Sequence, residues 1–135
     1  MVLKKPSARD IRRRHVGRKT VLRKGESARE LPALPPNLYT YRDELAIRRF
    51  IAKYPFLLPL LEEIPPHIRA YFPDEALELS VETDPENGRQ TLYIGIVTRA
   101  AFEQVWQQIR AFEQDWWIDN VHRGDYKLII GNEYL

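Results

Sequence analysis

Residues 77–82 alternate apolar and polar side chains with a period of two, and residues 91–98 put Leu92, Ile94 and Ile96 on one face of an extended chain and Tyr93, Gly95 and Val97 on the other. These period-two patterns predict two strands, the first with one face toward a core and the other face wet. The residues between them, 84–88, read Asp-Pro-Glu-Asn-Gly, and Asn87-Gly88 suits the positive φ angles of a tight turn. The pattern therefore predicts a β-hairpin.

Helical patterns precede and follow this hairpin. Thr40 is a candidate N-cap for a helix that runs to about residue 54, and a second, leucine-rich helix is expected over residues 56–63. Pro65-Pro66 is expected to end that second helix, because proline lacks the N–H that a helix interior needs.

After the hairpin, Thr98 is a candidate cap for a long helix that reaches about residue 118. Six apolar side chains at spacings of three or four form one stripe along this helix: Phe102, Val105, Trp106, Ile109, Phe112 and Trp116. Gln107 and Gln114 face away from the stripe. Residues 126–130 then read as a final strand.

These elements predict an α+β fold in the order ααββαβ. The helix between the second and third strands is a crossover connection, and the right-handed rule makes those two strands parallel. The simplest sheet is three-stranded and mixed, in the order 2-1-3. Tyr93, Val97 and Ile129 make its outer face too apolar to stay wet, so either the N-terminal helices or a partner covers it. The helices are the favoured cover, in a three-layer sandwich.

Charge divides the chain more sharply than its net +2 suggests. Residues 1–36 hold 11 Lys or Arg against three acids, which makes +8, whereas residues 37–135 hold 10 basic and 16 acidic residues, which makes −6. High charge with few large apolar residues predicts a flexible basic arm that ends in a proline-rich linker. The expected domains are therefore this arm and linker, 1–36, and a compact acidic α+β domain, 37–135.

A cationic arm binds polyanions by releasing condensed counterions, without reading their sequence. The candidate nucleic-acid-binding residues are ten cations of the arm: Lys4, Lys5, Arg9, Arg12, Arg13, Arg14, Arg18, Lys19, Arg23 and Lys24.

Composition argues against several kinds of chemistry. The chain has no cysteine, and its six glycines never cluster as they do in a P-loop or a Rossmann turn. It also lacks a Gly-x-Ser-x-Gly elbow. No apolar run approaches the roughly 18 residues that span a bilayer, and the N-terminus lacks the apolar core of a secretory signal. A cytoplasmic location is therefore expected.

Three groups of polar residues resemble parts of catalytic or metal sites. Glu63 and His67 are four apart, but Pro65-Pro66 between them argues against a shared helix face. A capping glutamate and a surface histidine explain them more simply.

The other two groups also have simpler explanations. Asp119, His122 and Asp125 carry ligand types for a divalent metal, yet such residues are common at helix ends and in turns. Glu78 and Glu82 point the same way on one strand, as an acid and a base would, and a solvated strand face accounts for them. No catalytic, metal or cofactor site is predicted.

Trp116 and Trp117 are adjacent, so on a helix they point about 100° apart and cannot both centre on the apolar stripe. Trp106 and Trp116 are expected in the core. Trp117 is expected at the edge of the buried zone, with its indole available to a protein partner, since aromatic residues are enriched at interfaces. The ordinary border of a core is the alternative.

These observations favour a small non-enzymatic binding or regulatory protein, in which the acidic domain engages a protein partner and the basic arm engages nucleic acid. The layout is similar to that of bacterial antitoxins, where one segment touches DNA and another neutralises a partner. The similarity is one of organisation and not of motif.

Two alternatives stay open. One is a small metal- or carboxylate-dependent enzyme, whose active site would bring Glu78, Glu82, Asp119, His122 and Asp125 into one pocket. The other is a domain of unknown role that carries a non-functional N-terminal extension.

Overall fold

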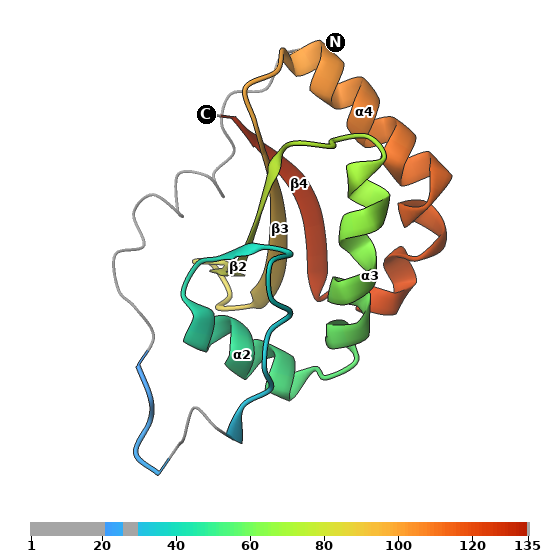
Figure 1. Cartoon of the computed structure of the whole chain (residues 1–135). Coiled ribbons are helices and arrows are strands. Elements are labelled where there is room, and N and C mark those ends of the chain that lie inside the picture. Colours follow the sequence, from blue (N-terminus) through green and yellow to red (C-terminus); the bar gives the residue numbers. More distant parts are fainter. Residues whose placement is uncertain (1–20, 26–29, 135) are drawn as a thin grey trace.

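The computed structural model describes residues 21–25 and 30–134. Its longer elements are β1 (Thr40–Tyr41), α2 (Glu44–Lys53), α3 (Leu57–Arg69), β2 (Ala76–Thr83), β3 (Gln90–Thr98), α4 (Phe102–Asp115) and β4 (Leu128–Tyr134) (Figure 1). Two short 3-10 helices, η2 (Trp117–Asp119) and η3 (Val121–Gly124), connect α4 to β4. The α+β class predicted from the sequence is confirmed, with four strands in the sheet instead of three.

The strands run in the order β1-β2-β3-β4, which corrects the predicted order. β2 and β3 form the predicted antiparallel hairpin. β3 and β4 are parallel, as predicted, but they are direct neighbours and are not separated by β2. The reason lies at the opposite edge, because β1 pairs with β2 in parallel and occupies the edge that β4 would have needed.

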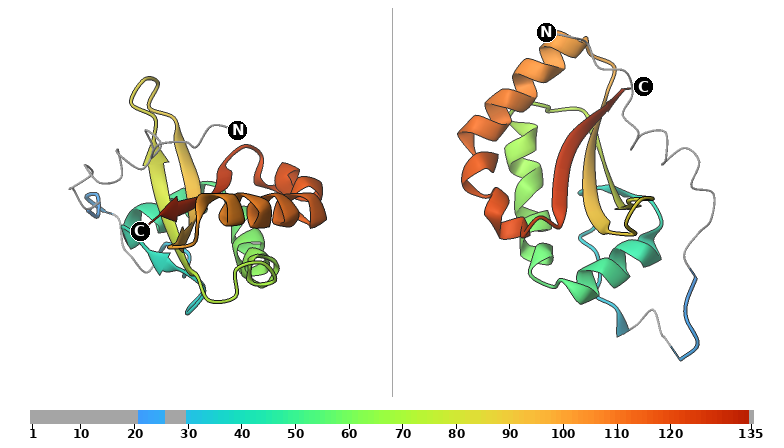
Figure 2. Two further views of the ribbon diagram at one scale, coloured as in Figure 1. Left: turned by 90° about the horizontal axis from the view of Figure 1, so that it is seen from above. Right: turned by 180° about the vertical axis from the view of Figure 1, so that it is seen from behind.

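The three described α-helices, α2, α3 and α4, contribute to one core on one face of the sheet. That core joins helix side chains to inner-face strand side chains, among them Ile47, Leu61, Phe112, Leu79 and Ile94. The outer-face residues Tyr93, Val97 and Ile129 are not part of it. Figure 2 shows α3 and α4 on the same side of the strands. The described part of the chain therefore has two layers, and the predicted three-layer sandwich is wrong.

The proline-rich segment before β1 is bonded to the folded body. Arg48 of α2 donates to the carbonyls of Leu31 and Pro32, both at 3.0 Å. The hydroxyl of Tyr41 donates to the carbonyl of Pro35. The polypeptide thus lies against α2 and β1 for several residues before the first strand begins.

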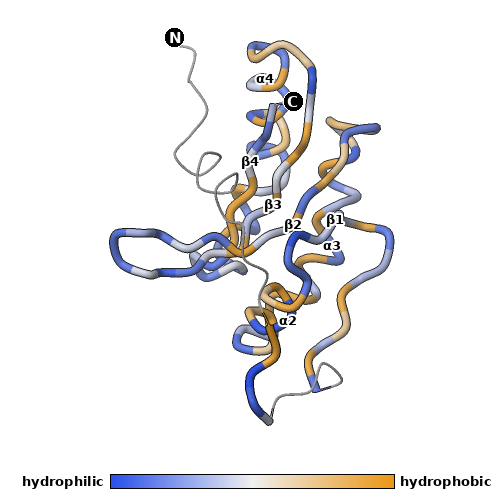
Figure 3. The backbone as a smooth tube through the Cα atoms, turned by 90° about the vertical axis from the view of Figure 1, so that its left-hand side faces the viewer, coloured by the Kyte–Doolittle hydropathy of each residue, from blue (hydrophilic) through white to orange (hydrophobic). Residues whose placement is uncertain are grey.

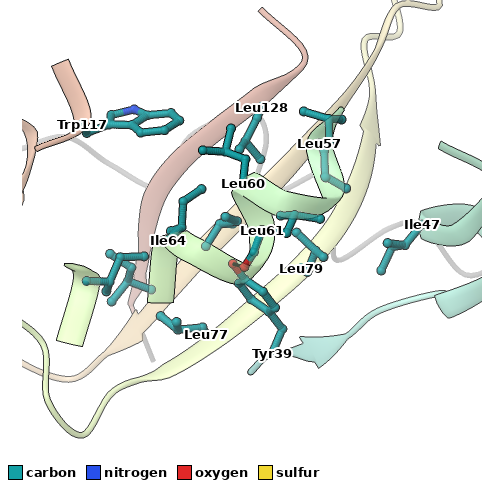
Figure 4. Close-up of a cluster of buried hydrophobic side chains, with 14 of the residues drawn as sticks. Tyr39, Ile47, Leu57, Leu60, Leu61, Ile64, Leu77, Leu79, Trp117 and Leu128 are labelled. Carbon is teal, nitrogen blue, oxygen red and sulfur yellow. Dashed lines mark hydrogen bonds between the residues drawn. The ribbon is translucent and has the colours of Figure 1, made fainter. Parts of the chain in front are cut away.

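Helix α3 continues through Pro65 and Pro66, where the sequence predicted its end. A proline inside a helix leaves the carbonyl four residues earlier without its usual N–H donor. For Pro65 this is the carbonyl of Leu61, a residue with no exposed surface. The hydroxyl of Tyr39 donates to that carbonyl at 2.7 Å (Figure 4). Burial raises the pKa of Tyr39 well above its usual value, so the hydroxyl stays protonated and can donate.

Pro66 in the same way frees the carbonyl of Glu62. Glu62 lies on the exposed side of the helix, where water can bond to it. The helix therefore reaches Arg69 and brings Ile68 into the core with no exposed surface.

Fewer of the apolar side chains along α4 are buried than the sequence predicted. Val105 and Phe112 are buried, whereas Trp106 is 40% exposed. Trp116 caps the helix with a φ of −145°, which turns the chain out of the helix and into η2. Trp117 then points into the core and is 6% exposed (Figure 4). The predicted placements of Trp106 in the core and of Trp117 at a partner-accessible edge are therefore wrong.

Removing the hydroxyl of Tyr39 should leave the carbonyl of Leu61 buried and unpaired. We predict that Tyr39→Phe lowers the free energy of unfolding by about 1–3 kcal/mol, the cost of a buried polar group that has lost its partner. Urea denaturation followed by tryptophan fluorescence measures this change.

A second substitution isolates the cause. Pro65→Ala restores an N–H that can donate to the carbonyl of Leu61. Tyr39→Phe should therefore cost at least about 1 kcal/mol less in the Pro65→Ala background than in the parent chain. Equal costs in the two backgrounds would show that the hydroxyl does not replace the missing donor.

Candidate functional site

An open groove of about 450 Å³ lies where three segments far apart in the sequence meet. The segments are the C-terminal end of α2, the turn between β2 and β3, and the turn before β4. The side chains that give the groove its character are Lys53, Tyr54, Arg89, Asp125, Tyr126 and Lys127.

Three cations and one carboxylate line this groove. Lys53, Arg89 and Lys127 supply the positive charges, and Asp125 supplies the negative one. The ammonium groups of Lys53 and Lys127 lie 5.7 and 5.2 Å from the centre of the Tyr54 ring. Attraction to the ring's electron-rich face offsets part of the repulsion between two like charges. The groove is thus a positive site on a domain that is acidic as a whole.

The turn between β2 and β3 is held by its own bonds. The N–H of Gly88 donates to the carbonyl of Asp84, and the N–H of Arg89 donates to the side chain of Asn87, both at 2.8 Å. Gly88 has a φ of 71°, the positive value expected for the second residue of Asn-Gly. These bonds fix the point at which Arg89 leaves the backbone.

The turn before β4 holds two successive residues in the left-handed region. Asp125 has a φ of 47° and Tyr126 a φ of 59°, and the N–H of Lys127 closes the turn on the carbonyl of Gly124 at 2.8 Å. Aspartate tolerates this conformation, but tyrosine pays about 1–2 kcal/mol for it. The ring of Tyr126 is 92% exposed, so burial does not offset that cost. Backbone strain of this kind is concentrated at functional sites.

The five polar residues weighed as an enzyme site do not come together. Glu78 and Glu82 lie on the outer face of β2. Asp119, His122 and Asp125 are all exposed, and only Asp125 lines the groove. Within residues 21–25 and 30–134, no three His, Asp or Glu side chains are arranged to hold a metal ion.

Glu63 and His67 do share a helix face, because α3 runs through the two prolines. Arg123 donates to the carboxylate of Glu63 at 2.7 Å, and this bond holds the pKa of Glu63 below its usual value. The imidazole of His67 stacks on the indole of Trp116, with ring centres 3.9 Å apart. These contacts join α3 to the segment that leads into the Tyr126 turn.

Eight of the ten arm cations predicted to bind nucleic acid lie outside the described residues: Lys4, Lys5, Arg9, Arg12, Arg13, Arg14, Arg18 and Lys19. Arg23 and Lys24 are described and exposed.

Sequence reasoning missed the groove. A weak signal was present, because Lys53-Tyr54 and Tyr126-Lys127 each place a cation beside an aromatic residue. Nothing in their spacing shows that the two pairs meet.

Comparisons with known proteins give this geometry no parallel: no protein-family model, no curated protein and no solved structure matches the chain. Among the described helices, none combines the length and the apolar character needed to cross a membrane.

The strain at Tyr126 predicts an unusual response to substitution. Asparagine enters the left-handed region more easily than tyrosine does. We expect Tyr126→Asn to leave the free energy of unfolding unchanged or to raise it by up to about 1 kcal/mol. Urea denaturation measures the difference.

Tyr126→Ala is the matched control, because it removes the ring but keeps a side chain that disfavours positive φ. The asparagine variant should be the more stable of the two. An alanine variant more stable than the asparagine variant would contradict the strain.

Proposed function

We propose that this chain is a small non-enzymatic binding protein that holds single-stranded nucleic acid in the groove beside Tyr126. The observation that carries the proposal is the set of three cations, Lys53, Arg89 and Lys127, next to a tyrosine ring that is 92% exposed. Sites for single strands combine positive side chains that follow the backbone with aromatic rings on which bases stack.

Each part of the groove has a matching part on a nucleotide. Lys53, Arg89 and Lys127 suit phosphate oxygens, which attract cations whatever the base sequence. The ring of Tyr126 offers a face for an unpaired base. Asp125 can accept a hydrogen bond from an exocyclic amino group of that base. A duplex keeps its base faces stacked inside, so a single strand fits better.

The basic N-terminal arm adds contacts in this proposal. Its +8 charge favours phosphate contacts that do not depend on sequence. The arm would supply affinity, and the groove would supply the preference for unpaired bases.

The same proposal keeps a protein partner for the folded domain, in the two-part layout similar to antitoxins. The support is an exposed set of large apolar side chains on α4 and the helices after it. Trp106 is 40% exposed, Val121 44% and Ile118 64%. Large aromatic residues are enriched where proteins meet.

Neutralising the two lysines of the groove should weaken binding and make it less sensitive to salt. For Lys53→Gln/Lys127→Gln, the slope of log K against log salt should fall by about 1.4 on a single strand, or about 0.7 for each lost phosphate contact. Fluorescence anisotropy with labelled oligonucleotides at several salt concentrations measures the slope.

The matched control is Arg99→Gln/Arg110→Gln, which removes the same charge from two exposed residues outside the groove. Its slope should stay close to that of the parent chain. Equal losses in the two variants would mean that total charge, and not the groove, governs binding.

Tyr126→Ala tests the stacking step separately. It should weaken binding to a single strand by about 1–3 kcal/mol, the contribution of one base stacked on an aromatic ring, and leave the salt slope unchanged. A duplex of the same sequence should lose much less. The same loss on both would remove the base-stacking role of Tyr126.

A further inference from the structure

The outer face of the sheet has no described helix over it. The described core lies on the other face, and Figure 3 shows β1 to β4 from the side over which no described helix lies. The side chains that point to this outer face include Glu78, Ser80 and Glu82 of β2, Tyr93 of β3 and Glu133 of β4.

The centre of this face is built around Tyr93, whose ring lies over two glycines. Gly95 and Gly131 are partners in the register of β3 and β4. A Cβ atom at Gly131 would lie 2.9 Å from the hydroxyl of Tyr93, and one at Gly95 would lie 3.1 Å from its ring. The two glycines thus leave a shallow seat for the ring, and Tyr93 is only 2% exposed.

Ser80, the register partner of Tyr93, is buried in the same way. It is 6% exposed, and its hydroxyl has no hydrogen-bond partner among the described residues. A buried hydroxyl without a partner is costly and rare. An aromatic ring and a hydroxyl buried on a face with no helix over it indicate a segment that lies across this face and brings polar groups to it.

The negative charge of the face indicates that the segment across it is positively charged. Glu78, Glu82 and Glu133 place three carboxylates around Tyr93, and the ion pair of Glu78 with Arg42 at 3.8 Å neutralises part of that charge. Residues 1–20 of this chain hold eight Lys or Arg and a single acid. A segment of +7 complements an acidic face.

The chain can also reach the face. Arg49 of α2 donates to the carbonyl of Val21, which places the start of the described chain beside α2. Twenty extended residues span about 66 Å, whereas four strands are only about 15 Å across. A short part of residues 1–20 is enough to cross the sheet.

We propose that the outer face of the sheet, around Tyr93 and Ser80, is the docking surface for the chain's own basic segment, residues 1–20. A second part of this inference rests on the proposed function. The same basic segment exchanges between this face and the phosphates of nucleic acid, so that nucleic acid competes with the carboxylates of Glu82 and Glu133 for the segment. Residues 1–20 then neutralise the acidic face of their own domain until nucleic acid displaces them.

The test uses the full chain with two face carboxylates neutralised, Glu82→Gln/Glu133→Gln. Its matched control is Glu103→Gln/Glu113→Gln, which makes the same change of charge on exposed positions of α4. The first readout is the rate at which trypsin cleaves within residues 1–20 without nucleic acid, followed by mass spectrometry. Thermal unfolding of both variants verifies that the fold is intact.

Docking predicts that the face variant is cleaved about three- to tenfold faster than the parent chain, the factor expected for the loss of two surface ion pairs. The control should be cleaved at the parent rate. Equal rates in the two variants would overturn the docking surface. Salt at 0.5 M should bring the parent rate up to that of the face variant, because it screens the attraction.

The second readout separates this inference from the proposed function. If the segment exchanges with nucleic acid, the face variant should bind a labelled single strand several-fold more tightly than the control does. Faster cleavage with unchanged affinity supports the docking surface and overturns the competition. An unchanged cleavage rate with lower affinity in the groove variants overturns the docking surface and leaves the groove in place.

Discussion

The hydrogen bond from Tyr39 to the carbonyl of Leu61 is the contact on which helix α3 depends. α3 contributes six buried residues, against three from α2 and two from α4, so the core rests mainly on this helix. Without a donor, the buried carbonyl of Leu61 would be unpaired, which would favour an end of the helix before Pro65. The last turn of α3 would then be lost from the core. A tyrosine hydroxyl supplied from outside the helix restores what the proline removes.

Helix α3 also contacts the segment that leads to the groove. The helix past Pro65 carries His67 to Trp116, while Glu63, one turn earlier, meets Arg123. These two contacts hold the short 3-10 helices that lead into the strained turn at Tyr126. These two contacts therefore link helix α3 of the core to the segment that carries the candidate site.

The sequence predicted those parts of the fold whose signal is local. The hairpin follows from the alternation over residues 77–82, the turn residues at 84–88 and the two-faced pattern of 91–98, and the parallel relation of the last two strands follows from the crossover helix between them. The strand order did not follow, because β1 has only two residues and carries no periodic pattern. The end of α3 was predicted too early, because the donor that compensates for Pro65 is the hydroxyl of Tyr39, 22 positions away from Leu61 in the sequence.

The position of Trp117 was predicted wrongly and the groove was not predicted at all, for related reasons. The placement of Trp117 assumed that the helix continued, and it turned inward once the chain left α4 at Trp116. The groove joins residues near positions 53, 89 and 126, and no spacing within the sequence relates these three segments. Pairings between distant segments are decided by tertiary packing, which pattern and propensity do not contain.

The parallel pairing of β3 with β4 has a consequence for how the chain folds. The hairpin joins β2 to β3 through a short turn, but β4 can pair only after α4, η2 and η3 have been folded back across the sheet. Contacts between residues far apart in sequence require a larger loss of chain entropy before they form. We therefore expect the hairpin to form early in folding and β4 to pair late. On this expectation, the strained turn that presents Tyr126 forms only when the last strand pairs with β3.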